Sequence, residues 1–353
     1  MLETSGNSNG KVSKYTIMCE EVPVLLFDRK ADAVTVYDSK YLPFALRKLD
    51  SIRPVDAFEW IINRIDNAQR TYMNMVYIAR KVGRDRDKMI KDSSGISFTD
   101  NFWLKTSDTN HTWSELNSLR DKSRELSLYA LTGKSENPAE LLKGHTSLFT
   151  TKGFFTKAII GKNLVKLRED ALLEYPAYLF GVQIGIPVAK CELDGDFVNI
   201  ELFTSGEVSL VHAAELKQYF DTDEEIYNEF VKMGRMDISE QIERMYIFDY
   251  LIGNPDMHDE NTGVLYDAKT FEFISLAPCY DHNIAFNKEF TGASHATKGR
   301  SSLLPLDDWS KRFIKNHDDI VEKLKSVDYS EIEKYVPKEQ FAEFQARIEK
   351  LLE

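Results

Sequence analysis

A short polar stretch contains the residue types that phosphoryl transfer requires. Asp256 follows a Gly-Asn-Pro break, Asn261 lies five residues after it, and Asp281 comes beyond two apolar runs. This order is typical of a kinase catalytic centre, where the first Asp orients or deprotonates the acceptor hydroxyl and the other two residues hold magnesium. Magnesium prefers hard oxygen ligands. The spacing therefore predicts Asp256 as the catalytic residue and Asn261 and Asp281 as metal ligands.

The flanking segments predict how these side chains are positioned. Residues 237–251 place apolar side chains at helical spacing, and Gly253-Asn254-Pro255 ends that helix because proline cannot continue the hydrogen-bond ladder. Residues 262–266 and 271–276 are short apolar runs separated by turn residues, which predicts a β-hairpin. The hairpin would bring the segment of Asp281 beside the loop of Asp256.

Three segments together carry a family resemblance: Leu251-Ile252-Gly253-Asn254, then Asp256-x-His258-x-x-Asn261, then Leu276-Ala277-Pro278-x-Tyr280-Asp281. As a composite they resemble the HipA-like serine/threonine kinases over roughly residue 144 to the C-terminus. The alternative, an acidic surface loop followed by a structural hairpin, requires the order, spacing and flanking runs all to be accidental. The resemblance implies a two-lobed, protein-kinase-like α+β fold with a small antiparallel β-rich N-lobe, a mostly helical C-lobe, and ATP and Mg²⁺ as cofactors.

The resemblance also implies residues that bind ATP. A strand Lys followed by a helix Glu is the kinase arrangement, and Lys166 and Glu174 are the candidates, with Lys157 as the rival for the phosphate-binding Lys. The helix of Glu174 is expected to begin near residue 173, because Pro176 is tolerated only near a helix start. The residues expected to contact ATP are Lys152, Gly153, Phe154, Lys157, Lys166, Glu174, the hinge residues Glu201, Leu202 and Phe203, and His258, Asp259 and Tyr280.

The catalytic loop departs from the family pattern. Family members often carry a basic residue there, whereas this chain has Met257, Asp259 and Glu260, which puts the transfer rate or the metal count in doubt. For His258 the preferred interpretation is a hydrogen-bonding organiser of the loop. The family also autophosphorylates a Ser in its phosphate-covering loop. The hydroxyls at that place here, which could instead cap turns, belong to Ser147, Thr150 and Thr151.

Composition limits the classes of function. The chain has 353 residues, 42% of them hydrophobic, which is enough for two lobes or domains. A net charge of −12 makes a nucleic-acid-binding surface an unexpected main function. Three scattered cysteines fit a reducing cytoplasm, and no signal peptide or membrane-spanning run is visible in the sequence.

The domain organisation follows from changes in pattern along the chain. Residues 1–14 are predicted to be a disordered tail, 15–143 an N-terminal accessory region, 144–204 the kinase N-lobe, and 205–353 a helical C-lobe with its catalytic loop at 253–286. The accessory region should contain a sheet of three strands (15–18, 22–27 and 33–37), helices at 55–64 and 71–82, and a capping box at Thr112 and Glu115. Residues 208–220 and 224–233 are predicted to be helical.

These features favour an ATP- and magnesium-dependent kinase of HipA type that acts on Ser or Thr hydroxyls of proteins, as the toxin of a toxin–antitoxin pair. A small-molecule or lipid phosphotransferase would share Asp256, Asn261 and Asp281. A pseudokinase that binds an antitoxin is the third hypothesis, because HipA-like proteins often act as toxins neutralised by DNA-binding partners. Retention of all three positions argues against loss of activity.

Overall fold

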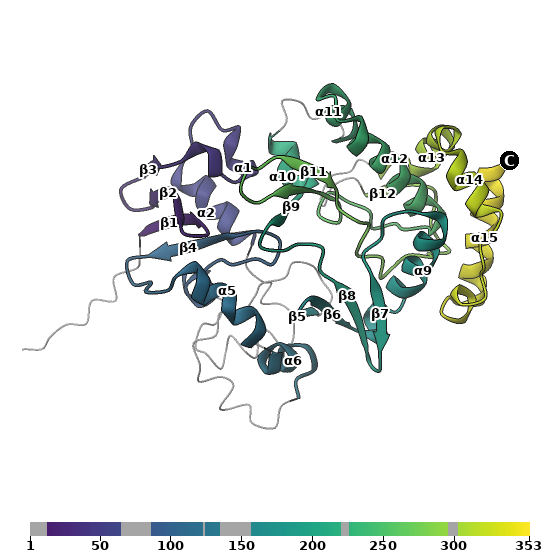
Figure 1. The fold of residues 1–353 in the computed structure, drawn as a ribbon, viewed down its shortest axis with the longest axis horizontal. Helices are drawn as coiled ribbons and strands as arrows, with labels where there is room; N and C mark the ends of the chain where they lie inside the picture. Colours follow the sequence, from purple (N-terminus) through teal and green to yellow (C-terminus); the bar gives the residue numbers. More distant parts are fainter. Residues whose placement is uncertain (1–12, 65–85, 123, 135–156, 220–225, 296–302) are drawn as a thin grey trace, which may run out of the picture.

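The computed structural model describes residues 13–64, 86–122, 124–134, 157–219, 226–295 and 303–353. These residues form a mixed α+β fold with antiparallel sheets, which confirms the predicted fold class (Figure 1). One sheet lies at the N-terminal end, a second lies in the middle, and helices gather at the C-terminal end. Most of the tail predicted to be disordered and the predicted helix at 71–82 lie outside the described residues.

The N-terminal sheet has the order β3-β2-β1-β4. Its strands are β1 (Lys14–Cys19), β2 (Val22–Asp28), β3 (Ala33–Val36) and β4 (Phe102–Thr106). The first three were predicted, and β4 was not. The sequence of β4 alternates poorly, because three consecutive side chains, Phe102, Trp103 and Leu104, are all buried. Packing on both faces of the sheet therefore hides the period-two signal.

The N-terminal region also contains short helices: α1 (Phe44–Arg47), α2 (Pro54–Ile62), α4 (Arg86–Ser93), α5 (Trp113–Lys122) and α6 (Arg124–Thr132), besides a 3₁₀ turn at Ser39–Tyr41. The predicted capping box is present, because Thr112 N–H donates to Glu115 Oε2 at 2.8 Å and Glu115 N–H donates to Thr112 Oγ1 at 3.3 Å. Trp103 and Trp113 lie in one small core with Leu116.

The middle sheet is antiparallel with the order β5-β6-β8-β7. Its strands are β5 (Lys157–Ile160), β6 (Asn163–Leu167), β7 (Cys191–Asp194) and β8 (Phe197–Glu201). Helix α8 (Arg168–Ala171) leads into α9 (Glu174–Ile184), where Pro176 occupies the first turn as expected. Leu131 of α6 packs with Ala158 and Val165 of this sheet, so the end of the N-terminal region rests on it.

A third sheet shows that the helix predicted at 208–220 is wrong in its first part. Residues 208–212 form strand β9 (Val208–His212) and not the start of a helix; α10 (Ala213–Tyr219) begins only afterwards. Strand β9 pairs along its full length with β10 (Gly263–Asp267), which pairs in turn with β11 (Phe273–Leu276), and these two strands form the predicted hairpin. The partner strand is distant in sequence, so local spacing could not reveal the pairing.

The C-terminal part is mostly helical: α11 (Ile226–Lys232), α12 (Met236–Leu251), α13 (Leu306–Phe313), α14 (Asp318–Leu324) and α15 (Lys338–Leu352), with 3₁₀ turns at Ile314–Asn316 and Ile332–Lys334 and a two-residue ladder of β12 (Ser294–His295) with β13 (Leu303–Leu304). Helix α12 buries eleven of its sixteen residues and lies at the centre of this part. Among the described residues, no helix has the length and apolar character needed to cross a bilayer.

The N-terminal region and the catalytic hairpin share one hydrophobic core. Phe44 of α1 contacts Tyr266 of β10 edge-on, with ring centroids 5.1 Å apart, and stacks on Phe273 of β11 at 5.2 Å. Aromatic pairs of this kind add stabilisation beyond the area they bury. The N-terminal region therefore supports the hairpin that follows the catalytic loop.

Candidate active site

The predicted catalytic loop begins where helix α12 ends. Gly253 has φ +59°, a left-handed conformation that glycine adopts without steric cost, and a Cβ atom there would lie 2.6 Å from Arg347 Nη2. Arg347 of α15 donates from Nε to Leu251 O at 3.0 Å, which satisfies one of the free carbonyls at the helix C-terminus. The predicted helix break is therefore fixed by a cation from the last helix.

Within the loop, Asp256, His258 and Asn261 are brought together. Asn261 Nδ2 donates to Asp256 O at 2.9 Å, and Asn261 N–H donates to His258 O at 2.8 Å. Glu260 N–H donates to His258 Nδ1 at 3.1 Å, so the ring proton lies on Nε2, which is 3.7 Å from Asp256 Oδ1. His258 thus organises the loop by hydrogen bonds. The Asp256 side chain is 45% exposed, which leaves its carboxylate open to an acceptor substrate.

The segment of Asp281 is tied to that loop and to the segment between α9 and β7. Tyr280 OH donates to Glu260 O at 3.3 Å. Cys279 N–H donates to Pro187 O and Ala189 N–H donates to Cys279 O, both at 2.9 Å. Asp281 itself has φ +67°, a left-handed conformation that Asp tolerates better than most residues. These bonds fix the place of Asp281 between the two halves of the candidate site.

Lys166 lies at the centre of a buried polar cluster. Its Nζ donates to Glu174 Oε1 at 2.5 Å, to Asp281 Oδ1 at 2.6 Å and to Asn283 Oδ1 at 2.8 Å. An ammonium group has three hydrogens, and each of them has one acceptor here. The side chain is only 1% exposed. The structure therefore brings Lys166, Glu174 and Asp281 together.

Lys157 lies beside this cluster because of strand register. Lys157 of β5 pairs directly with Lys166 of β6, and opposite residues of an antiparallel pair project on the same face of a sheet. Lys157 Nζ is 3.7 Å from Asp281 Oδ2, so the two lysines approach the two oxygens of one carboxylate. Both candidates for the phosphate-binding Lys are therefore present at the site.

The charges of the cluster determine its protonation. Burial alone would raise the pKa of Asp281, but the ammonium groups of Lys157 and Lys166 outweigh it and hold that pKa far below the usual range. Burial alone would lower the pKa of Lys166, but Asp281 and Glu174 raise it. Burial lowers the pKa of His282, which Glu174 only partly opposes. At neutral pH the cluster holds an ionised Asp281 and a charged Lys166.

The expected hinge residues lie at the end of β8. Leu202 N–H donates to Lys162 O at 2.9 Å, and Glu201 lies 3.7 Å from Lys190 on the exposed side. The Phe203 ring contacts that of Tyr280, with centroids 5.4 Å apart. Phe203 and Tyr280 therefore share an apolar surface close to Asp281, whereas the Glu201 side chain points away from it.

Other expected ATP contacts are not brought to the cluster or are not described. Asp259 is buried, and its Oδ1 lies 2.9 Å from Lys217 Nζ of α10, so this carboxylate faces the helix and not the lysine cluster. The remaining predictions for the phosphate-covering loop lie outside the described residues: Lys152, Gly153, Phe154, Ser147, Thr150 and Thr151.

Sequence reasoning missed two asparagines. Asn283 accepts the third hydrogen of Lys166, and its only sequence signal is its place two residues after Asp281. Asn254 lies in the helix break but is 2% exposed, and its side chain bonds to both the helix and the loop. In the sequence, Asn254 belongs to the helix break and to the segments that carry the family resemblance, but neither signal gives its side chain a role.

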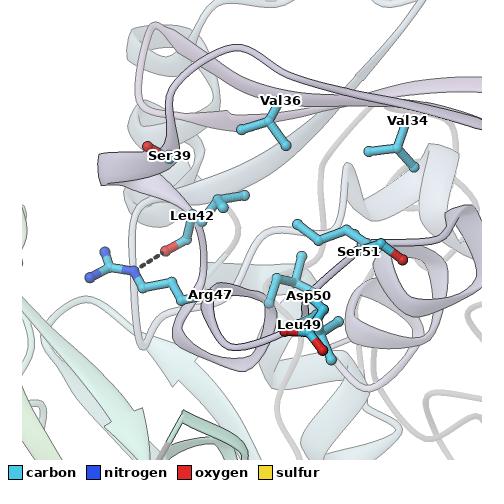
Figure 2. Close-up of a pocket in the computed structure, with 10 residues that line it drawn as sticks. Val34, Val36, Ser39, Leu42, Arg47, Leu49, Asp50 and Ser51 are labelled. Atoms are coloured by element: carbon cyan, nitrogen blue, oxygen red, sulfur yellow. Dashed lines mark hydrogen bonds between the residues drawn. The ribbon is translucent and has the colours of Figure 1, made fainter.

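A hollow of about 410 Å³ lies elsewhere, in the N-terminal region (Figure 2). Val34 and Val36 of β3, Leu42, Leu49 and Asp50 are among its lining residues. Arg47 donates from Nε to Leu42 O at 2.7 Å at its wall. None of the predicted catalytic residues lines it.

The donor set at Asn261 and Asp281 fits magnesium. One amide and one carboxylate are hard oxygen ligands, and magnesium usually takes few protein ligands besides water and phosphate oxygens. Asp281 remains ionised beside the two lysines, as a metal ligand must. No group of three or more His, Cys, Asp or Glu side chains suited to a metal is present in the described part of the chain.

Comparisons with known proteins identify the family of the chain. The family model described as the HipA-like C-terminal domain matches residues 146–336, more than half of the chain. The chain therefore belongs to the HipA-like family, and the predicted resemblance is confirmed. No curated protein matches it.

Two solved structures are similar in fold. A complex of HipA, HipB and operator DNA from Shewanella oneidensis MR-1 has a TM-score of 0.51 and 12% identity, and the match covers 96% of each chain. The proinflammatory kinase CtkA of Helicobacter pylori has a TM-score of 0.38 and 13% identity, with coverage of 56% of this chain and 89% of that one. The first match extends the shared fold to the N-terminal region.

Proposed function

We propose that this protein is an ATP- and magnesium-dependent kinase of HipA type that phosphorylates serine or threonine hydroxyls of a protein. The observation that carries the proposal is the buried Lys166 bonded to both Glu174 and Asp281. Protein kinases require a strand Lys paired with a helix Glu, and an Asp beyond the catalytic loop that holds magnesium. Residues from β6, α9 and the segment after β11 supply these three groups here.

Each residue has a role in this proposal. Asp256 orients the acceptor hydroxyl and takes its proton as the oxygen attacks the γ-phosphorus; the bond from that phosphorus to the β-phosphate oxygen breaks and ADP leaves. Asn261 and Asp281 would hold magnesium, which neutralises phosphate charge when bound. Lys166 or Lys157 binds the α- and β-phosphates, while Phe203 and Tyr280 flank the base. Exposure of the Asp256 carboxylate supports its role toward an external acceptor.

Labelled ATP with magnesium tests the proposal. Wild-type protein should transfer label to itself or to an added protein, and Asp256→Ala should lower the rate by at least about 10³-fold because the acceptor is no longer oriented. Asp308→Ala, an exposed Asp of α13, is the matched control and should retain the rate. Equal transfer by wild type and Asp256→Ala would refute the assignment.

The substrate class is a second part of the proposal. A small-molecule or lipid phosphotransferase would use the same catalytic groups, so the acceptor must be identified directly. A phosphate-transfer screen against protein extracts and against metabolite pools, each with wild type and Asp256→Ala, separates the two. Label on protein Ser or Thr supports the kinase, and label on small molecules alone supports the alternative.

We also propose a cytoplasmic toxin that pairs with an antitoxin protein. The structure of similar fold contains HipA together with HipB, and the three cysteines here are free and buried. A net charge of −12 argues against direct DNA contact by this chain. Growth arrest on expression of wild type but not of Asp256→Ala is the expected result; equal growth would contradict the toxin role.

Autophosphorylation is the last part of the proposed function. A phosphate on Ser147, Thr150 or Thr151 would add about −1.5 to −2 charges where ATP phosphates bind, and so would repel the nucleotide. Incubation with Mg-ATP followed by mass spectrometry should detect it. If a substrate is phosphorylated while these three residues stay unmodified, self-inhibition is wrong and the turn-capping alternative stands.

A further inference from the structure

The backbone of Asp256 is held from both sides by asparagine side chains. Asn254 Oδ1 accepts from Asp256 N–H at 3.1 Å, and Asn261 Nδ2 donates to Asp256 O at 2.9 Å. The two bonds fix both peptide groups that flank the Asp256 Cα. The direction of the exposed Asp256 carboxylate therefore depends on these two amides.

Asn254 is itself held by a buried carboxyl group. Its Nδ2 donates to Asp249 Oδ1 at 2.7 Å, and its N–H donates to Asp249 O at 2.9 Å. Asp249 and Asn254 are 3% and 2% exposed. Water therefore cannot replace Asp249 as the acceptor, and an Asn254 amide without this acceptor would be left unsatisfied.

Asp249 has no role in the chemistry proposed above. It lies in α12, and no ion pair with a Lys, Arg or His joins it among the described residues. An isolated buried carboxyl is costly to keep, and such groups persist where a specific hydrogen bond requires them. The bond it makes leads through one side chain to the backbone of Asp256.

We propose that Asp249 and Asn254 are positioning residues for the catalytic Asp256, connecting the rigid end of α12 to the loop. Asp249 fixes the Asn254 amide, and the fixed Asn254 oxygen holds the Asp256 N–H. This inference rests on the proposed kinase function. Its physical basis is that a misplacement of about 1 Å at a catalytic group can lower a rate about 10²-fold.

The ionisation of Asp249 gives the proposal a signature. Burial raises the pKa of Asp249 to about 7, although the bond from Asn254 opposes it. Within the part of the chain that the structure describes, the titratable group that faces it is the Cys279 thiol, which stays neutral because burial raises its pKa well above the usual value. An ionised carboxylate accepts a hydrogen bond more strongly than a neutral carboxyl. Loop positioning should therefore improve as pH rises through about 7.

The experiment measures kcat, the KM for Mg-ATP and the Kd for Mg-ATP by calorimetry. Asp249→Leu removes the acceptor, and we expect kcat to fall about tenfold to a hundredfold while the Kd changes by less than about twofold. Asp249→Asn keeps an oxygen acceptor of the same shape and should restore most of kcat. Because an amide does not ionise, Asp249→Asn should also lack the rise of kcat with pH near 7 that we expect of wild type.

Glu243→Leu is the matched structural control. Glu243 is another largely buried carboxylate of α12, bonded to Tyr227 OH and His317 Nε2, each at 2.9 Å, and it does not contact the loop. Its loss should lower the melting temperature without lowering kcat. Equal effects of Asp249→Leu and Glu243→Leu on kcat would overturn the proposal. If Asp249→Leu does not fold, Asn254→Ala, which removes both side-chain bonds, serves the same test.

Phosphate transfer by wild type distinguishes a failure of the positioning role from a failure of the proposed kinase function. If wild type transfers phosphate and Asp256→Ala does not, but Asp249→Leu and Asn254→Ala keep the wild-type kcat, only the positioning role is refuted. If wild type transfers no phosphate, both are refuted.

Discussion

Two buried ion pairs, one in the N-terminal region and one at the candidate active site, use charge differently. Arg64 Nη1 and Nη2 donate to the two oxygens of Asp100, both at 2.6 Å, and neither side chain is more than 7% exposed. Asp100 also accepts from Phe102 N–H at 2.9 Å. At the other site, two lysines share the carboxylate of Asp281, which is 20% exposed.

This difference in solvent exposure and contact geometry indicates a separate role for each set of charges. The first is a two-point contact between planar groups, closed to solvent, which fixes the entry to β4. The second binds one partly exposed carboxylate with two point charges, so under the proposed function its geometry could change when phosphates and a metal compete for the same groups. Perturbed, partly accessible charge clusters are typical of functional sites.

The largest expected effect is at Asp281. Asp281→Asn keeps an oxygen for Lys166 but removes the charged metal ligand, so we expect weaker magnesium-dependent ATP binding and a loss of transfer of at least about 10³-fold. Labelled-ATP assays at several magnesium concentrations, with the melting temperature as a control for folding, measure it. Unchanged transfer would show that Asp281 is not a metal ligand.

The Arg64–Asp100 pair, which is closed to solvent, should affect the free energy of unfolding and not catalysis. Arg64→Met leaves Asp100 buried without its cation and should lower the free energy of unfolding by about 3–5 kcal/mol. Arg53→Met breaks an exposed pair with Asp56 and should lower the free energy of unfolding far less, because solvent screens an exposed pair. Denaturant titration measures both. A fall in kcat per folded Arg64→Met molecule would contradict the separation of the two pairs.

Substitution of each lysine tests the role of the charge cluster formed by Lys157, Lys166 and Asp281. Lys166→Met should raise the KM for ATP and depress kcat, with about 10²-fold lost in kcat/KM, because phosphate positioning supplies most of the catalysis. Lys157→Met is the matched variant from the facing strand position. If Lys157→Met alone has this effect, Lys157 binds the phosphates and Lys166 anchors Asp281.

The smallest effect is expected at the helix cap of α5. Thr112→Ala removes the side-chain acceptor for Glu115 N–H and should lower the free energy of unfolding by about 1 kcal/mol. Catalysis should be unchanged, as expected for the N-terminal region. Thermal unfolding beside Ser107→Ala, an exposed hydroxyl in the preceding turn, provides the comparison.

The sequence by itself determined the elements whose signals are local. Helix α12, the Gly-Asn-Pro break and the hairpin after it were predicted, because apolar spacing and turn chemistry act over a few residues. The capping box at Thr112 was predicted for the same reason. The spacing of Asp256, Asn261 and Asp281 identified the candidate site, since that order reflects its chemistry; their roles stay predictions.

Only the tertiary structure decided which groups meet across the chain. Strand β9 pairs with a strand more than fifty residues away, and Lys166 meets Asn283, which is 117 positions distant. Strand register places Lys157 opposite Lys166, and burial makes Asp249 an acceptor that water cannot replace. Such contacts depend on packing between segments that are far apart in sequence, and no local pattern of residue types encodes them.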